Sequence, residues 1–192
     1  WSRRFLGNLG VKLPILPLTV SVARTAPMEG PTEIAVGGAD FSFRKRADGG
    51  FIVTHRSAVK APITLDHFLI GHKYSSSLRT QGKYLRVAIG RDFVDDLRLP
   101  RRWNPEGPSP FEQVRLKDPS VDMGAIDEAF VALRAAWPVF DAAEIAEVWA
   151  GTVDVTPDSL PVVDHISEIP GLVICTRFSG HGFGTAPAAG EL

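Results

Sequence analysis

The fold of this chain is best approached from its C-terminal part, where residues 172–184 read LVICTRFSGHGFG. Residues 172–176 are almost entirely apolar, which predicts a buried, central β-strand. Glycines at positions 180, 182 and 184 follow, and they allow the backbone to approach a bound molecule closely. If a helix begins there, its free N–H groups favour an anion or an electron-rich ring edge. The glycine spacing departs from the dinucleotide fingerprint GxGxxG, so a turn without a ligand remains the alternative.

The sequence on the N-terminal side of this stretch predicts a helix and two strands. Ile126, Phe130, Leu133 and Trp137 recur with helical spacing, which predicts a helix over Met123–Trp137. We expect Phe130, Trp137 and Trp149 to be core residues. The strands predicted in this part of the chain are Val148–Val155 and Pro161–Asp164, on either side of a turn at residues 156–159.

The N-terminal half predicts a short helix followed by an antiparallel meander. Residues 1–10 are expected to be helical because Gly10 is a typical helix end. Leu18, Val20 and Val22 alternate at period two, which predicts a strand over Leu16–Thr25. The fold class is therefore α+β, with a mixed, mostly antiparallel sheet and flanking helices. Shorter strands are predicted at Ile34–Val36, Phe41–Arg44, Phe51–Val53, Phe68–Gly71 and Tyr84–Ile89.

The composition excludes several classes of protein. The chain has 192 residues and a formal net charge of −1, from 21 Lys+Arg against 22 Asp+Glu, without a basic run that would indicate nucleic-acid binding. It has no apolar run of the roughly 18–20 residues needed to span a bilayer. A single cysteine, Cys175, excludes an internal disulfide and fits a cytoplasmic location. We expect Cys175 to be a buried core residue.

Several motifs in the last quarter of the chain resemble the C-terminal part of the FAD-dependent D-amino-acid oxidase family. They are Trp149-Ala150-Gly151, TPDSLPVVD at residues 156–164, IPGLVI at residues 169–174 and FSGHGFG at residues 178–184. The family includes glycine oxidase, sarcosine oxidases and D-amino-acid dehydrogenases. The resemblance implies a two-domain flavoenzyme with a dinucleotide-binding domain and a substrate domain built on a large, mostly antiparallel sheet. No strand–GxGxxG–helix unit occurs in the 192 residues, so we expect the FAD-binding domain to lie upstream of Trp1.

The resemblance also implies a division of the chain and a set of flavin contacts. It places a substrate domain over residues 1–148 and a C-terminal segment that returns to the FAD site over residues 149–192. His181 is the candidate catalytic base, and the alternative is that it only orients the turn. The implied flavin contacts are Ser179, Gly180, His181, Gly182, Phe183 and Gly184.

Substrate binding is expected to use an arginine, because a planar guanidinium matches a carboxylate in a bidentate manner. Glycine oxidase-like members place this arginine just after the Trp-Ala-Gly motif, where the present chain has Val153. Arg177 also departs from the family, which mostly has glycine there, and it is a candidate for substrate or flavin contact. The other candidate substrate-binding residues are Arg44 and His55, with Arg56 and Lys60 as further substitutes.

Five more positions bear on the chemistry. Sarcosine oxidases have a lysine at the position of Gly184 that promotes reaction with oxygen, so its absence favours a dehydrogenase. They attach the flavin through a cysteine where this chain has Trp149, so we expect FAD to be non-covalent. Asp154, Asp158 and Asp164 lack His or Cys partners at ligand spacing, so we expect no metal site.

The resemblance implies an FAD-dependent oxidoreductase that oxidises the C–N bond of a small amino or imino acid by hydride transfer to the flavin. A D-amino acid, a D-proline derivative or sarcosine would be typical substrates. Two alternatives stay open, namely a catalytically silent fragment or subunit of such a flavoprotein, and an oxidase of a hydroxy acid on the same scaffold. The oligomeric state is not predicted.

Overall fold

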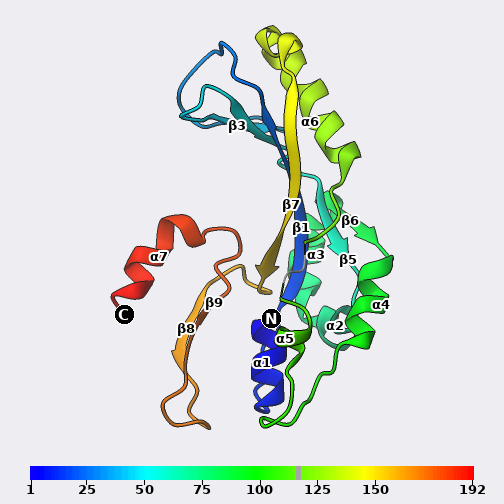
Figure 1. The fold of residues 1–192 in the computed structure, drawn as a ribbon, viewed down its shortest axis with the longest axis vertical. Helices are drawn as coiled ribbons and strands as arrows, with labels where there is room; N and C mark the ends of the chain where they lie inside the picture. The colour runs from blue at the N-terminus through cyan, green and yellow to red at the C-terminus, as the bar shows by residue number, and fades with distance from the viewer. Residues whose placement is uncertain (116–117) are drawn as a thin grey trace.

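A long antiparallel ribbon of two strands forms the axis of the molecule (Figure 1). The computed structural model describes residues 1–115 and 118–192. Strand β1 (Leu16–Thr25) pairs with β7 (Ile145–Val155) along its whole length, from Leu16 opposite Val155 to Thr25 opposite Ile145. The strand predicted over Leu16–Thr25 is confirmed, because its alternating apolar residues match the two faces of a sheet.

The other edge of β1 is shared by two strands. β4 (Phe51–Thr54) pairs with the second half of β1, and β5 (Val59–Pro62) pairs with its first half at Thr19. β3 (Ser42–Lys45) and β2 (Val36–Gly37) extend the sheet beyond β4, while β6 (Leu85–Ala88) runs parallel to β5. The result is a seven-stranded, mostly antiparallel sheet, which confirms the predicted fold class.

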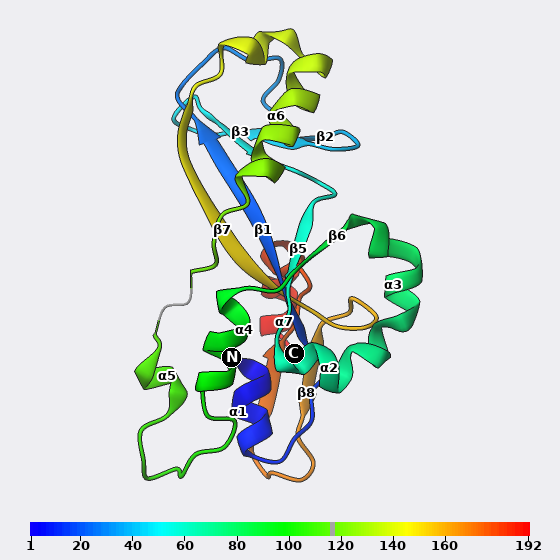
Figure 2. The same ribbon diagram turned by 90° about the vertical axis from the view of Figure 1, so that its right-hand side faces the viewer.

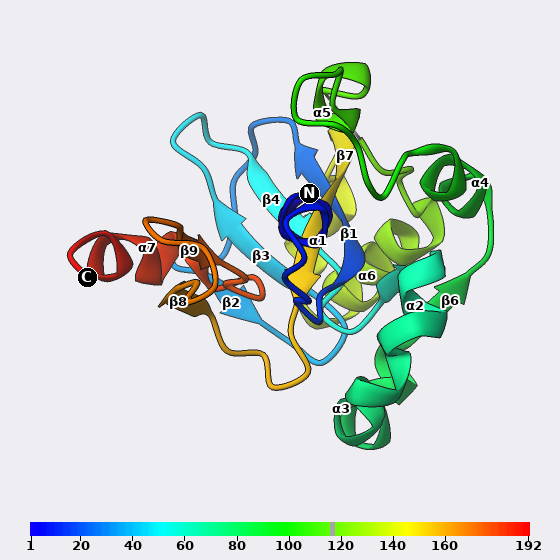
Figure 3. The same cartoon turned by 90° about the horizontal axis from the view of Figure 1, so that it is seen from below.

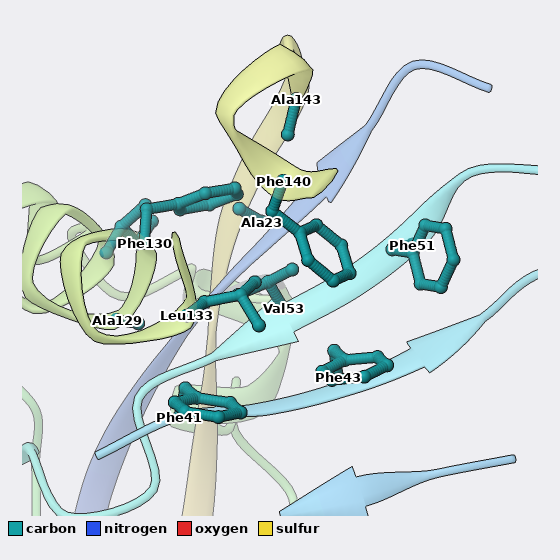
Figure 4. Close-up of a cluster of buried hydrophobic side chains, with 11 residues drawn as sticks. Ala23, Phe41, Phe43, Phe51, Val53, Ala129, Phe130, Leu133, Phe140 and Ala143 are labelled. Carbon is teal, nitrogen blue, oxygen red and sulfur yellow. The ribbon is translucent and has the colours of Figure 1, made fainter. Parts of the chain in front are cut away.

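Helix α6 (Met123–Ala136) covers one face of this sheet at the far end of the ribbon (Figure 2). It begins at Asp122, whose carboxylate accepts the Ala125 N–H and caps the helix. Figure 4 shows Phe130 and Leu133 pointing from the helix towards the strands. The predicted helix and the core position of Phe130 are confirmed, and Trp137 packs partly buried against the same core. The buried residues of this first core are Ala23, Phe41, Phe43, Phe51, Val53, Ile126, Ala129, Phe130, Leu133, Phe140 and Ala143.

A second, smaller core lies at the opposite end of the ribbon. Helix α1 (Ser2–Asn8) packs there against the two-stranded sheet of β8 (Val162–His165) and β9 (Val173–Thr176). Its buried residues are Leu6, Leu13, Ile15 and Ile174.

The position of β9 corrects two predictions. Its apolar run is a strand, but it belongs to the two-stranded sheet and is not central. Only Ile174 is buried, because it points to α1, whereas Val173 is 55% exposed on the opposite face. Cys175 shares that outer face and is exposed, so its assignment to the core was wrong.

The chain between β5 and α6 is mainly helical. It contains α2 (Leu65–Ile70), the 3₁₀ segments η1 (Gly71–Tyr74) and η2 (Gly82–Tyr84), α3 (Ser75–Gln81), α4 (Arg91–Arg98) and α5 (Pro110–Gln113). The strand predicted at Phe68–Gly71 is wrong, because Thr64 and His67 form a reciprocal cap that starts α2. The strand predicted around β6 is confirmed. Two further helical segments complete the chain, η3 (Pro138–Ala142) after α6 and α7 (Gly182–Gly190) at the C-terminus.

Seen from below, β8, β9 and α7 lie on one side of β1, and α2, α3 and α4 lie on the other (Figure 3). None of the helices in the described ranges is long and apolar enough to cross a membrane. The proposed division between residues 148 and 149 falls inside β7, which continues unbroken through it.

A network of charges ties α1 to α2 and α4. Asp66 accepts from Arg3 Nη2 at 2.9 Å and from Arg101 Nη1 at 2.6 Å. Asp96 accepts from Arg4 Nη2 at 2.5 Å and from Arg101 Nη2 at 3.0 Å. Both carboxylates are nearly buried, with side chains 13% and 10% exposed. Charge-assisted pairs with so little exposure are screened less by water than surface pairs, so the network fixes how α1 and α2 meet.

Candidate functional site

The turn between β9 and α7 has a strained backbone. Arg177, Ser179 and Gly180 have φ angles of 68°, 48° and 87°, in the left-handed region that residues other than glycine rarely adopt. The His181 N–H donates to the Phe178 carbonyl at 2.7 Å and closes the turn. Strain of this kind is held by the surrounding structure and is concentrated at binding sites. The turn is therefore the first candidate for a site.

Its glycines are needed for different reasons. Gly180 supplies a left-handed conformation that costs other residues about 1 kcal/mol or more. Gly182 leaves room for Phe178, because a Cβ at position 182 would lie 3.2 Å from the Phe178 Cβ. Gly184 meets nothing within 4 Å, so its side faces open space. The turn thus presents bare backbone on an open side of the molecule.

The N-terminus of α7 lies at the end of this turn. His181 is its N-cap, no side chain caps it, and its first turn holds no acidic residue. The first N–H groups of a helix have no partner within the helix and carry the positive end of its dipole. His181 and Phe183 are exposed here, Phe183 to 99%. An anion or an electron-rich ring edge is favoured at such a position.

A second turn supports the first one. Thr156 is 2% exposed, donates from Oγ1 to the Leu160 carbonyl at 3.1 Å and lies 3.5 Å from the Ser179 Oγ. The Asp158 carboxylate accepts the Leu160 N–H at 3.1 Å, and this bond is the main reason that the pKa of Asp158 is lowered. The turn at residues 156–160 is thereby rigid and braces the glycine-rich turn.

Arg177 is the buried charge of this region. Its side chain is 4% exposed, and neither Nε nor Nη2 has a hydrogen-bond partner among the described residues. Burial lowers its pKa, while Tyr74, Asp154 and Asp158 act in the opposite direction. The guanidinium is therefore buried close to Tyr74, Asp154 and Asp158.

Tyr74 connects Arg177 to the main sheet. Its hydroxyl lies 2.7 Å from the Val155 carbonyl and 3.0 Å from the Pro14 carbonyl, to which it donates. Burial raises the pKa of Tyr74 to about 12, so it stays neutral at physiological pH. Tyr74 therefore has a structural role as a hydrogen-bonded residue of the chain, and it does not act as a general acid near pH 7.

A cavity of about 880 Å³ lies over β1, β5 and β6, with η1 and α3 on its far side. It reaches the second turn, because Val155 and Ser159 belong to its lining. Its charged side chains are Arg56 and Asp40, and its histidine is His67. Burial lowers the pKa of His67, so this ring favours the neutral form. The apolar lining residues that matter below are Leu16, Leu18, Val59, Leu78, Leu85 and Val87.

Arg56 is held at the edge of this cavity by the loop before β3. Its Nη1 donates to the Gly38 carbonyl at 3.2 Å, and the neighbouring Ser57 Oγ donates to the Ala39 carbonyl at 2.9 Å. The loop carrying Arg56 and the loop carrying Asp40 are thus bonded to each other. Of the two arginines weighed for carboxylate binding on the sheet, Arg56 is the one that lines the cavity.

The other predicted substrate-binding residues lie elsewhere. Arg44 is an exposed residue of β3, paired with Ile52, and does not line the cavity. His55 is buried, and its Nδ1 accepts the N–H groups of Ser57 and Ala58 at 3.0 and 2.9 Å. His55 therefore shapes the loop that presents Arg56, and the structure does not bring Arg44, His55 and Arg177 together.

Two residues of β7, Trp149 and Val153, stand at positions that differ from those of related flavoenzymes, and both lie on one face of the sheet. Val153 pairs with Leu18, and Trp149 pairs with Val22. This is the face opposite α6, on which Leu18 lines the cavity. Trp149 is 36% exposed, so the expectation that it is a core residue was wrong. Gly180 approaches Val153, because a Cβ there would lie 3.8 Å from the Val153 Cγ1.

The aspartates considered for metal binding have structural partners. Asp158 caps its own turn, and Asp164 accepts the His165 N–H at 2.7 Å. In the part of the chain that the structure describes, no group of three or more His, Cys, Asp or Glu residues could hold a metal ion.

A mostly antiparallel sheet together with a glycine-rich strand–turn–helix is compatible with the fold of a flavin-dependent oxidoreductase. The chain matches the family of FAD dependent oxidoreductases (DAO) over residues 1–192, and it belongs to this family. The resemblance inferred from the sequence is confirmed. No curated protein matches the chain.

Solved structures give the same fold. L-Amino acid deaminase from Proteus myxofaciens, in complex with anthranilate, is 34% identical, with a TM-score of 0.92 over 100% of this chain and 42% of that one. L-Amino acid deaminase from Proteus vulgaris is 28% identical, with a TM-score of 0.90 over 100% of this chain and 44% of that one. Glycine oxidase from Geobacillus kaustophilus, at 13% identity, a TM-score of 0.58 and coverage of 96% and 35%, shows the fold alone. The chain spans less than half the length of these proteins.

The residues of the turn fit the cofactor of this family. The six candidate flavin contacts, residues 179–184, occupy the turn and the start of α7. Bare backbone at Gly180 and Gly184 leaves room for a flat ring, and the uncapped N–H groups suit its electron-rich edge. Sequence reasoning named Arg56 only among several substitutes and did not select Asp40, because the sequence does not show that the two residues share a cavity.

Proposed function

We propose that the protein to which this chain belongs is an FAD-dependent oxidoreductase that oxidises the C–N bond of an amino acid with a large apolar side chain. The observation that carries the proposal is the 880 Å³ apolar cavity, which has Arg56 at its edge and the braced glycine-rich turn beside it. A cavity of this size accepts a small molecule, and the apolar lining favours a hydrocarbon or aromatic group.

The chain would contribute the flavin contacts and the substrate pocket. FAD, when bound, supplies the acceptor for a hydride from the substrate carbon. Residues 179–184 are the proposed contacts for it, and the uncapped start of α7 would stabilise negative charge at the ring edge. The backbone of the glycine-rich turn would keep its conformation when the flavin binds, because Thr156 and Asp158 stabilise the neighbouring turn.

Arg56 is the proposed partner of the substrate carboxylate. A guanidinium binds a carboxylate strongly because its planar fork donates two parallel charge-assisted hydrogen bonds. The side chain of the substrate would then extend over Leu18 and Val59 towards Leu78. The relatives named deaminases of L-amino acids support an amino acid as substrate. Among amino and imino acids, the apolar lining favours amino acids whose side chains fill this pocket.

His181 has two proposed roles at the turn. Its N–H closes the turn at 2.7 Å, which fixes the backbone. Its imidazole is exposed next to the flavin contacts and is the candidate to take up the proton of the amine. The buried charge of Arg177, two residues before Ser179, would make the electrostatic potential at the flavin contacts more positive.

Three finer features complete the proposal. The absence of a lysine at Gly184 favours a dehydrogenase that passes electrons to an acceptor other than oxygen. Trp149 stands where sarcosine oxidases attach their flavin, so FAD binding is non-covalent. An FAD-binding domain upstream of Trp1 would supply the contacts to the pyrophosphate, and residues 149–192 would return to it.

The test is a spectrum of the full-length protein. We expect a yellow protein whose flavin is released by denaturation with acid, as a non-covalent cofactor is. Under argon its visible absorption should bleach with phenylalanine or leucine and much less with glycine. A colourless protein, or one bleached equally by glycine, would contradict the proposal. Assays with oxygen and with an artificial dye then separate an oxidase from a dehydrogenase.

A further inference from the structure

The lining of the cavity carries two opposite charges on two loops that are bonded to each other. Asp40 and Arg56 are its only carboxylate and guanidinium among the lining residues of the described chain. Both side chains are exposed. A charge of each sign at one end of an apolar cavity is the arrangement that a zwitterion requires.

The two loops that carry these charges are fixed relative to each other. Arg56 Nη1 bonds the Gly38 carbonyl at 3.2 Å, and Ser57 Oγ bonds the Ala39 carbonyl at 2.9 Å. The Gly38 N–H donates to the Phe41 carbonyl at 2.8 Å and closes a turn around Asp40. These bonds hold the turn that carries Asp40 against the loop that carries Arg56, so both residues keep their places in the lining of one cavity.

Neither charge is neutralised by a partner in the described residues. Arg56 has only the Gly38 carbonyl, and Asp40 makes no ion pair or side-chain hydrogen bond there. Other charges close to them in sequence are paired, such as Lys45 with Glu33 at 2.6 Å and Arg46 with Asp48 at 3.0 Å. Asp40 and Arg56 thus line the cavity without an ion pair of their own, which leaves both charges available to a ligand.

We propose that Asp40 is a specificity-determining residue that binds the α-amino group of the substrate while Arg56 binds its carboxylate. The proposal rests on the proposed function and adds the group that distinguishes an amino acid from a hydroxy acid or a simple carboxylic acid. A carboxylate accepts a hydrogen bond from an ammonium strongly, from a neutral amine less strongly, and gains nothing from a missing amine. The ligand class is therefore an α-amino acid whose apolar side chain points to Leu78 and Val87.

The experiment compares two ligands that differ by the amino group. Phenylalanine and 3-phenylpropionate share a carboxylate and a phenyl ring. Their dissociation constants are measured by calorimetry on the full-length holoenzyme under argon after reduction of the flavin, where no turnover occurs, with both enantiomers of phenylalanine. The variants are Asp40→Asn, Arg56→Gln and, as a control, Asp127→Asn, an exposed carboxylate on α6.

Asp40→Asn should raise the dissociation constant of phenylalanine about tenfold or more and change that of 3-phenylpropionate by no more than about twofold. Arg56→Gln should weaken the binding of both ligands, and Asp127→Asn should change the binding of neither. Flavin content and circular dichroism equal to those of the native protein show that each variant is folded. An equal effect of Asp40→Asn on both ligands, or none on phenylalanine, overturns the role of Asp40 while the proposed function stands. If the native protein binds neither ligand, the proposed substrate class fails and Asp40 falls with it.

Discussion

Replacing Asp66 with asparagine should loosen the junction between α1 and α2. Asp66→Asn keeps the shape of the side chain but removes the charge that accepts from Arg3 at 2.9 Å and from Arg101 at 2.6 Å. The two guanidinium groups then remain half-buried without this partner. Because α2 and η1 carry His67 and Tyr74, which line the cavity, the change should also reach the proposed substrate pocket.

The magnitude follows from the exposure of the partners. Exposed ion pairs contribute up to about 1 kcal/mol, whereas breaking a fully buried pair costs about 3–5 kcal/mol. The side chains of Asp66, Arg3 and Arg101 are 13%, 20% and 34% exposed, between these limits. We therefore expect Asp66→Asn to lower the free energy of unfolding by about 2–3 kcal/mol.

The pH dependence gives an independent check. Burial raises the pKa of Asp66, but Arg3 and Arg101 lower it by more, so the folded pKa lies below the usual value. The unfolded chain then binds the proton more tightly, so the stabilisation is present above the unfolded pKa of about 3.9 and is lost as the pH falls through the folded pKa. The difference between the native protein and Asp66→Asn should therefore shrink below about pH 4.

The assay is urea unfolding of the full-length protein from pH 7 to pH 3. Asp95→Asn is the matched control, because Asp95 makes only exposed contacts with Arg91 and Arg98 at 3.6 and 3.8 Å. Its effect should stay within about 0.5 kcal/mol. Equal losses in the two variants, or a difference that does not change with pH, would refute the reasoning.

Three further predictions concern the core and the turn. Phe140→Ala should lower the free energy of unfolding by about 3–5 kcal/mol in denaturant titrations, because the ring is fully buried between Phe43 and Phe51; a loss below about 1 kcal/mol would contradict this packing. Gly180→Ala should weaken flavin retention during dialysis because of the φ of 87°, whereas Gly182→Ala should act by displacing Phe178; retention as tight as in the native protein would speak against a role of the turn. Arg177→Met should leave the thermal unfolding temperature equal or higher, because it removes a buried charge that lacks hydrogen bonds on Nε and Nη2; a large decrease would show that this charge has a stabilising partner.

The parts of the fold that the sequence predicts well are those with long periodic patterns. β1 alternates over ten residues, and α6 repeats apolar residues through four turns, so each has one consistent burial pattern. The apolar run of β9 was misjudged because four apolar residues fit both a central strand and a strand with one buried residue. Phe68–Gly71 was misjudged because its start is a cap made by a histidine, which departs from the usual glutamate.

The candidate site divides in the same way. The glycine-rich turn is contiguous in sequence, so its motif could be recognised directly. The cavity is assembled from segments that lie far apart along the chain, including the loops of Asp40 and Arg56 and the helix that carries Leu78. Which of several basic residues faces the cavity depends on tertiary packing. The sequence alone therefore could not distinguish Arg56 from Arg44 and His55 as the residue that lines it.

The two hydrophobic cores lie at opposite ends of the β1–β7 ribbon, and few apolar contacts outside the ribbon join them. Each end can then open with its own free energy, because cooperative unfolding spreads only as far as side chains share a packed interior. Amide hydrogen exchange should report two protection levels, one for α6 with β3 and β4, and another for α1 with β8 and β9. A ligand seated near the glycine-rich turn would slow exchange first at the α1 end, leaving the α6 end close to its unliganded rate.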